Sequence, residues 1–129
     1  MIVVDSSVWI ANLRDIDTKA VRSLRSIEDP DDILVGDLIL LEMLQGARSE
    51  AHAARLETAL RQFRIERMLD EELAVLGARH YRTLRDKGVT IRKTIDLIIG
   101  TFCLARGHFL LHDDRDFDPM AAQLGLRVI

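Results

Sequence analysis

Hydrophobic positions along the chain follow two patterns that alternate. Short apolar runs of three residues, typical of buried parallel strands, occur at Ile2–Val4, 33–35 and Phe109–Leu111. Between these runs, apolar residues recur at spacings of three and four, most clearly over 50–63 and 70–87. This spacing is the period of an amphipathic helix. Strands that alternate with helices predict an α/β fold with a parallel sheet and helices on both faces.

Weaker signals complete the predicted order of elements. Short strands are expected within 63–68 and over 126–129, which brings the sheet to about five strands. Further helices are expected at 38–46 and 95–106, and a last one opens at Asp118-Pro119. Three positions carry residue types that cap helix N-termini. Ser6 or Ser7 is expected to cap a helix through Arg14, Asp17 to cap a second helix, and Thr94 to cap the helix at 95–106.

Length and composition limit the class of protein. A chain of 129 residues with 48% hydrophobic residues fits one compact domain over 1–129. Its net charge of −3 gives no general attraction to nucleic acid, so any such binding must come from local patches. The single cysteine, Cys103, excludes an internal disulfide framework and a cysteine-based zinc site. The N-terminus lacks the pattern of a signal peptide, and the most apolar segment is about half as long as a membrane-spanning helix. We expect a cytoplasmic protein with no membrane contact.

Carboxylates come from four separated segments of the chain. Asp5 follows the first predicted strand, and Asp114 follows the strand at Phe109–Leu111. Asp96 lies in the first turn of the most apolar helix. Glu42 lies about five residues into the helix after the second strand, roughly 7.5 Å along its axis. Because the carboxyl ends of parallel strands and the N-termini of the following helices share one edge of a sheet, these acids are expected to meet there.

Read singly, most of these acids have an ordinary explanation. Asp5 can cap a helix, Asp96 can be an acid at a helix start, and the acids around Asp114 can form a charged surface loop. Glu42 has no such explanation, because its neighbours are apolar and an unpaired buried carboxylate costs several kcal/mol. Taken together, and without a histidine or cysteine cluster, the acids predict an all-oxygen site for a hard cation, Mg²⁺ or Mn²⁺.

The acids stand in motifs that resemble the four signature regions of PIN-domain proteins and, more narrowly, of the VapC toxins of bacterial toxin–antitoxin pairs. The motifs are Asp5-Ser6-Ser7, Leu41-Glu42-Met43-Leu44-Gln45-Gly46-Ala47-Arg48, Asp96 at the start of an apolar helix, and Leu111-His112-Asp113-Asp114-Arg115-Asp116-Phe117. The resemblance covers essentially the whole chain in length, order and spacing. It implies a PIN-like three-layer fold, with a central, mostly parallel sheet of about five short strands.

The resemblance also implies the activity and the site. It implies a Mg²⁺- or Mn²⁺-dependent endoribonuclease that hydrolyses RNA phosphodiester bonds and inhibits translation and growth. The catalytic acids are then Asp5, Glu42, Asp96 and Asp114, with Asp5, Asp96 and Asp114 as metal ligands and Asp116, Ser6, Ser7 and His112 as auxiliary residues. The family often has Thr or Ser where His112 stands. This departure leaves two roles open for His112: metal or proton chemistry, or a local structural or substrate contact.

Partners follow in part from the residues and in part from the resemblance. Arg92 and Lys93 precede Asp96 and are the expected RNA contacts. The resemblance implies an RNA substrate of the tRNA or rRNA class, a cognate VapB-like antitoxin, a homodimer and a toxin–antitoxin hetero-oligomer. The sequence itself offers only one candidate docking surface, the apolar residues Trp9, Ile10, Leu13 and Ile16, and Trp9 is expected either in the core or in the lining of a partner groove.

Other function classes fit less well. A phospho-receiver domain also places acids and Mg²⁺ at the carboxyl edge of a parallel sheet, but it needs a lysine after a late strand. Lys19, Lys87 and Lys93 do not follow strands. A phosphatase with an Asp nucleophile would have a second Asp at position 7, where Ser7 stands. A catalytically inactive PIN-like module that binds RNA or a partner remains as an alternative, although the set of acids argues against it.

Overall fold

The computed structural model describes all residues, 1–129, and its centre is a four-stranded parallel sheet. The strands are β1 (Ile2–Val4), β2 (Ile33–Gly36), β3 (Arg64–Glu66) and β4 (Phe109–Leu111). Their order in the sheet is β3-β2-β1-β4, with Val3 in register with Leu34 on one side and with Leu110 on the other. The predicted parallel α/β sheet is therefore confirmed.

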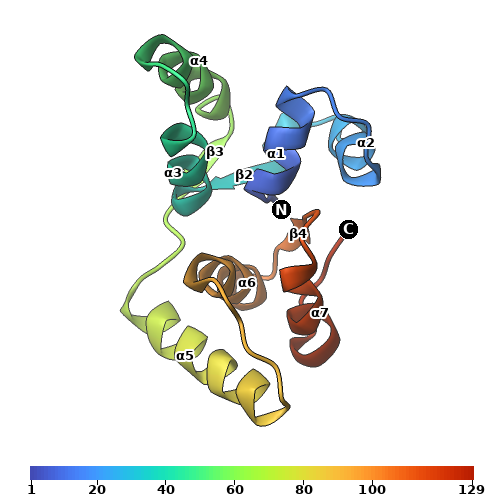
Figure 1. The fold of residues 1–129 in the computed structure, drawn as a ribbon, viewed down its shortest axis with the longest axis vertical. Helices are drawn as coiled ribbons and strands as arrows, with labels where there is room; N and C mark the ends of the chain where they lie inside the picture. The colour runs from blue at the N-terminus through green and yellow to red at the C-terminus, as the bar shows by residue number, and fades with distance from the viewer.

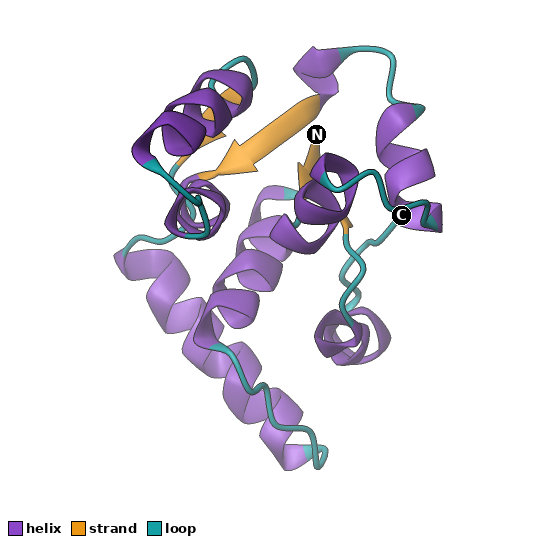
Figure 2. Ribbon diagram, turned by 45° about the horizontal axis from the view of Figure 1, so that its top comes forward, coloured by secondary structure: helices purple, strands orange, loops and turns teal.

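Seven helices cover the two faces of the sheet. α1 (Ser6–Leu13), α2 (Lys19–Arg25), α3 (Asp37–Gln45) and α4 (Glu50–Leu60) lie on one side (Figure 1). α5 (Glu71–Asp86), α6 (Thr94–Arg106) and α7 (Asp118–Leu124) lie on the other, where α5 packs along α6 (Figures 1 and 2). Two short 3₁₀ helices, Pro30–Asp32 and Arg115–Phe117, precede β2 and α7. No helix combines the length and the apolar character needed to cross a membrane.

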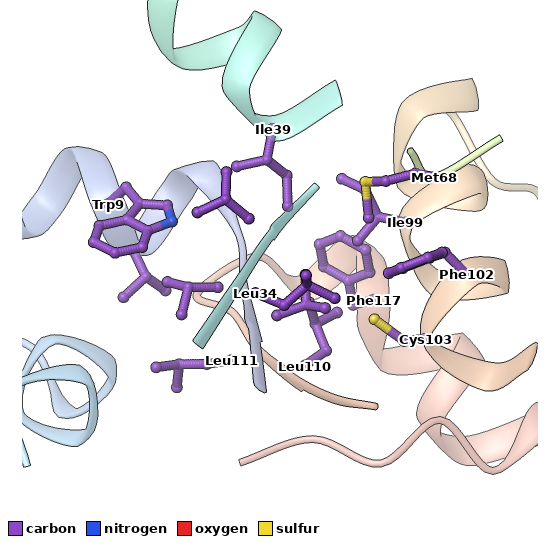
Figure 3. Packing of buried hydrophobic residues seen from close by; sticks show 14 of the residues in the cluster. Trp9, Leu34, Ile39, Met68, Ile99, Phe102, Cys103, Leu110, Leu111 and Phe117 are labelled. Carbon is purple, nitrogen blue, oxygen red and sulfur yellow. The ribbon is translucent and has the colours of Figure 1, made fainter. Parts of the chain in front are cut away.

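The core lies against both faces of the sheet. Val3, Val4 and Leu34 in the two central strands are fully buried, which explains why these strands read as continuous apolar runs. Trp9 and Ile39 pack on the side of α1 and α3, and on the opposite side a larger group packs under α6 and α7, as Figure 3 shows: Met68, Ile99, Phe102 and Phe117. A sheet packed on both faces has only its edges left for polar chemistry.

The predicted terminal strand is reduced to one bridge. Val128 pairs with Leu110 in parallel, and Leu110 exchanges hydrogen bonds with Arg127 O (2.9 Å) and Ile129 N (3.0 Å). The sheet therefore has four strands and an isolated bridge in place of a fifth strand. Residues 127–129 extend the sheet next to β4. Only Leu110, the central residue of this three-residue strand, pairs with them.

Some predicted helix starts and ends are displaced. α1 is capped by Asp5 and not by Ser6 or Ser7, and α2 is capped by Thr18, whose Oγ1 accepts a hydrogen bond from Val21 N. Asp17 pairs with Arg22 at 2.7 Å instead. Thr94 is the first residue of α6 and supplies no cap, and the helix predicted over 50–63 ends at Leu60. The displaced caps arise because neighbouring Ser, Thr and Asp residues have nearly equal capping ability.

Candidate metal centre

The sheet order creates one topological switch point. The chain leaves β1 for β2 on one side, whereas β4 joins β1 on the other side. Ligands of open α/β sheets bind at such a point, beyond the carboxyl ends of the strands. Asp5 directly follows β1, its N–H donates to Leu111 O at 2.9 Å, and the acidic loop 112–116 directly follows β4. The two strands therefore deliver acids to the same edge.

Asp5 is held by the serine two residues after it. The Asp5 side chain is buried, with 4% of the residue exposed, and its Oδ2 accepts from Ser7 N (3.1 Å) and from Ser7 Oγ (2.6 Å). The Ser7 hydroxyl in turn accepts from Asp113 N at 3.2 Å. Asp5 thus caps α1 while Ser7 ties it to the loop after β4, so the helix-cap explanation and the site explanation apply to the same carboxylate.

Glu42 reaches this edge from α3. It is half-buried, and its Oε1 accepts a hydrogen bond from Ser6 Oγ at 3.3 Å. Burial raises the pKa of Glu42, and the Asp5 carboxylate raises it further, while the Ser6 hydrogen bond and Lys93 oppose the rise. A carboxyl with a raised pKa next to a second carboxylate is a group that holds a proton more readily than a surface acid does.

Asp96, Asp114 and Asp116 form the tightest group of acids. One carboxylate oxygen from each lies within 4.8 Å of the others. Asp96 is 5% exposed, and its Oδ2 is buried without a hydrogen-bond donor. Asp114 accepts from Asp116 N at 2.9 Å, which caps the 3₁₀ helix and fixes the loop.

The electrostatics of this group centre on Asp96. Burial raises the pKa of Asp96 to about 6. Lys93 opposes the rise, and the Asp114, Asp5 and Glu42 carboxylates add to it. Four acids from four segments therefore act on one another through space, as the sequence predicted.

Lys93 lies at these carboxylates. Its Nζ is 3.4 Å from Asp114 Oδ2, 3.9 Å from Asp116 Oδ2 and 4.0 Å from Asp96 Oδ2. The sequence predicts Lys93 only as an RNA contact, and its contact with the acids was not predicted. The i,i+3 spacing of Lys93 and Asp96 across the start of α6 was the available signal.

The other predicted residues have different surroundings. Arg92 is exposed and directly precedes Lys93 in the chain. His112 is oriented by its own loop: its Nδ1 faces Asp114 N at 3.2 Å, and its ring packs on Phe117 with ring centroids 5.0 Å apart. Nδ1 is therefore engaged by the backbone, which favours a local structural contact over metal chemistry at that nitrogen.

A divalent cation fits the donor set. The group offers only carboxylate oxygens, which hard cations such as Mg²⁺ and Mn²⁺ prefer. The buried Oδ2 of Asp96 accepts no hydrogen bond, and its positive neighbour, Lys93 Nζ, is 4.0 Å away. An unsatisfied buried carboxylate oxygen is costly, so this atom favours a cation that binds it more closely. Asp96, Asp114 and Asp116 would hold such a cation, and Asp5 and Glu42 border them.

A cavity extends from Glu42 between α1, α3 and α4. It has a volume of about 390 Å³, and its lining combines apolar and basic side chains, including Ile10, Leu13, Arg14 and Arg48. Of the predicted docking residues, Ile10, Leu13 and Ile16 are exposed. Trp9 is not: it is 7% exposed and packs on Phe63, so it belongs to the core. An indole buried against the sheet stabilises the fold and is not available to a partner.

Comparisons with known proteins identify the family and agree with the fold. Ribonuclease VapC11 of Mycobacterium tuberculosis is 29% identical over 126 residues, which cover 94% of this chain and 92% of the relative. The structure of VapBC2 from Rickettsia felis bound to a DNA fragment from their promoter matches with a TM-score of 0.79 at 16% identity, over 100% of this chain and 98% of that one. The structure of Mycobacterium tuberculosis VapC20, a sarcin–ricin loop cleaving toxin, matches with a TM-score of 0.68 at 18% identity, over 95% of each chain. The family model described as "PIN domain" matches residues 2–123, and the chain therefore belongs to the PIN-domain family.

Proposed function

We propose that this protein is a metal-dependent endoribonuclease that acts as the toxin of a toxin–antitoxin pair. The observation that carries the proposal is the buried Asp96 oxygen, which accepts no hydrogen bond, among carboxylates delivered by the end of β1, α3, α6 and the loop after β4. The relatives named as VapC ribonucleases support the reaction class. We further propose that residues 1–129 act as one PIN domain.

The acids divide into those that bind the cation and those that serve the reacting groups. Asp96, Asp114 and Asp116 are proposed to bind Mg²⁺ or Mn²⁺ directly, and Asp5, which borders them, is proposed to complete the ligand set. When bound, the cation supplies Lewis acidity to a water and to the scissile phosphate and offsets the negative charge that would otherwise repel RNA. Glu42, whose pKa is raised by burial and by Asp5, is the proposed proton-holding acid of the reaction.

The serines position the acids. Ser7 fixes the rotamer of Asp5 through two hydrogen bonds and joins it to the loop of Asp114, and Ser6 donates to Glu42. Neither hydroxyl is needed as a nucleophile in this scheme. His112 supports the loop from its packing on Phe117.

Arg92 and Lys93 are the proposed contacts to RNA phosphates, because both are exposed, Lys93 lies at the carboxylates, and Arg92 directly precedes it in the chain. A net charge of −3 makes such local cations necessary for RNA to approach. The substrate is proposed to be a structured RNA of the tRNA or rRNA class; the relative VapC20, a sarcin–ricin loop cleaving toxin, supports this class.

A VapB-like antitoxin is the proposed partner, since structural neighbours are VapBC complexes, some of them bound to DNA. The cavity that opens from Glu42 past Ile10 and Leu13 offers such a partner an apolar groove with two arginines at its wall. A homodimer and a toxin–antitoxin hetero-oligomer complete the proposed assembly.

The test uses the purified protein freed of any partner. We expect it to cleave RNA in the presence of Mg²⁺ or Mn²⁺, to stop when a chelator is added, and to be inactive as Asp96→Asn. In cells, induction of the chain should slow growth, whereas Asp5→Asn at equal expression should be harmless. Binding of RNA without cleavage under all metal conditions would favour the inactive PIN-like module instead, and chelator-resistant cleavage by Asp96→Asn would refute the metal site.

A further inference from the structure

Three carboxylates at the site share one positive side chain. The Lys93 ammonium lies 3.4 to 4.0 Å from oxygens of Asp114, Asp116 and Asp96. The nearest approach, to Asp114 Oδ2, is also a hydrogen bond. Each of these three acids is also one of the group whose oxygens lie within 4.8 Å of one another. The ammonium therefore lies at the same three carboxylates that would bind a divalent ion.

Lys93 has no other role in the fold that would explain this position. It is the residue before α6, but its side chain does not cap the helix. Its side chain is 61% exposed, so it does not fill the core. The acids, by contrast, need a cation: Asp96 is buried, and its Oδ2 lacks a hydrogen-bond donor. A single flexible ammonium on a four-carbon stem can reach this group from outside and can also leave it without any change in the backbone.

We propose that Lys93 is a built-in counter-cation of the metal-free site, and that a divalent ion and the Lys93 ammonium compete for Asp96, Asp114 and Asp116. The inference rests on the proposed function, since it assumes that these acids bind a divalent ion. Metal binding then has two coupled effects: the acids are neutralised, and the ammonium is released to the exposed edge of the site. Lys93 thereby lowers the affinity of the acids for the divalent ion and stabilises the protein while the ion is absent.

The strength of the competition follows from the exposure of Lys93. Exposed ion pairs contribute little individually, because water and salt screen them. Three such contacts to one ammonium are expected to shift the dissociation constant for the divalent ion by about tenfold, which corresponds to about 1.4 kcal/mol. A buried ion pair would give a much larger shift, and a lysine that points away would give none.

The experiment measures binding of Mn²⁺ alone, without RNA. Free Mn²⁺ is followed by electron paramagnetic resonance during titration of wild type, Lys93→Met and Lys93→Arg, with Lys87→Met as the matched control. Lys87 is an exposed lysine at the end of α5, so its replacement makes the same change in net charge away from the acids. We expect Lys93→Met to bind Mn²⁺ about tenfold more tightly than wild type, and Lys93→Arg and Lys87→Met to bind it as wild type does.

Thermal denaturation supplies an independent readout. In chelator, Lys93→Met is expected to melt below wild type because the carboxylates lose their counter-cation, and saturating Mn²⁺ is expected to remove that difference. Equal or weaker Mn²⁺ binding by Lys93→Met would overturn the inference while leaving the proposed nuclease intact. If wild type and every variant fail to bind Mn²⁺, the metal site itself is wrong and the inference falls with it.

Discussion

Asp96→Asn separates a metal site from a structural ion-pair network. The substitution keeps the shape of a side chain that is 5% exposed and removes its charge. In the metal-free protein that charge has one cation, Lys93 at 4.0 Å, and several acids around it. We therefore expect Asp96→Asn to stabilise the metal-free protein at neutral pH, although most substitutions of buried polar residues destabilise.

The magnitude follows from the pKa. The pKa of Asp96 rises from 3.8 to about 6 in the folded chain, chiefly through burial. The folded state therefore binds more protons than the unfolded state between about pH 4 and pH 6, and the free energy of unfolding falls as the pH rises through this window. At about 1.4 kcal/mol per pKa unit, the charged carboxylate costs about 3 kcal/mol above that window. Because the asparagine amide is itself a buried polar group, we expect a net gain of about 1–3 kcal/mol at pH 7.5.

The assay is thermal denaturation of both proteins at pH 4 and pH 7.5, with chelator and with Mg²⁺. At pH 7.5 in chelator, Asp96→Asn should melt several degrees above wild type, since each kcal/mol moves the melting temperature of a chain this size by about 4 °C. At pH 4 the difference should nearly vanish, because the wild-type carboxyl is then protonated in the folded state. Mg²⁺ should stabilise wild type more than the variant. A loss of about 3–5 kcal/mol in chelator, with no response to Mg²⁺, would refute the shared-cation site.

Two further predictions test how the fold supports the site. Gly36→Ala should lower the unfolding free energy by about 1–3 kcal/mol in urea titrations, because a Cβ at Gly36 would overlap Sδ of the fully buried Met68. Gly46→Ala should change it by less than about 0.5 kcal/mol, because the atoms nearest to a Cβ there are 3.7 Å away. Asp70→Ala should cost about 1 kcal/mol, because Asp70 accepts from Leu73 N at 2.8 Å as the cap of α5, and Asp70→Asn should retain most of that stability. Equal unfolding free energies for both glycine variants, or for both Asp70 variants, would contradict these explanations.

Much of the fold could be predicted because hydrophobic spacing and burial coincide. The runs at β1 and β4 are buried between two layers of helices, so their patterns carry a strong signal. The segment 126–129 has a similar composition but forms only one bridge, and nothing in its pattern distinguishes a full strand from a single pairing. Caps were displaced by one residue for the same reason, since Asp17 and Thr18 are both good caps and their side-chain partners decide between them.

The acids of the site were predicted as a group, because strand order determines which segments meet at an edge. Their individual surroundings were not. Ser7 joins Asp5 to the loop after β4 across 106 residues of sequence, and no local pattern reports such a contact. Lys93 shows the same limit, because its approach to Asp114 and Asp116 depends on how the loop after β4 lies over the start of α6.

The site is also where the chain departs most from what folding alone would favour. Natural sequences are locally consistent with their folds, and the exceptions tend to mark function. Here four acids from separate segments meet at one sheet edge, and one of them, Asp96, is buried without a donor for its Oδ2. Replacing Asp96 by a neutral residue of the same shape is expected to relieve this repulsion, so stability alone does not explain its presence. A carboxylate group that weakens the metal-free fold is useful only if a cation binds it, and the same group then links the stability of this protein to the metal that its proposed reaction requires.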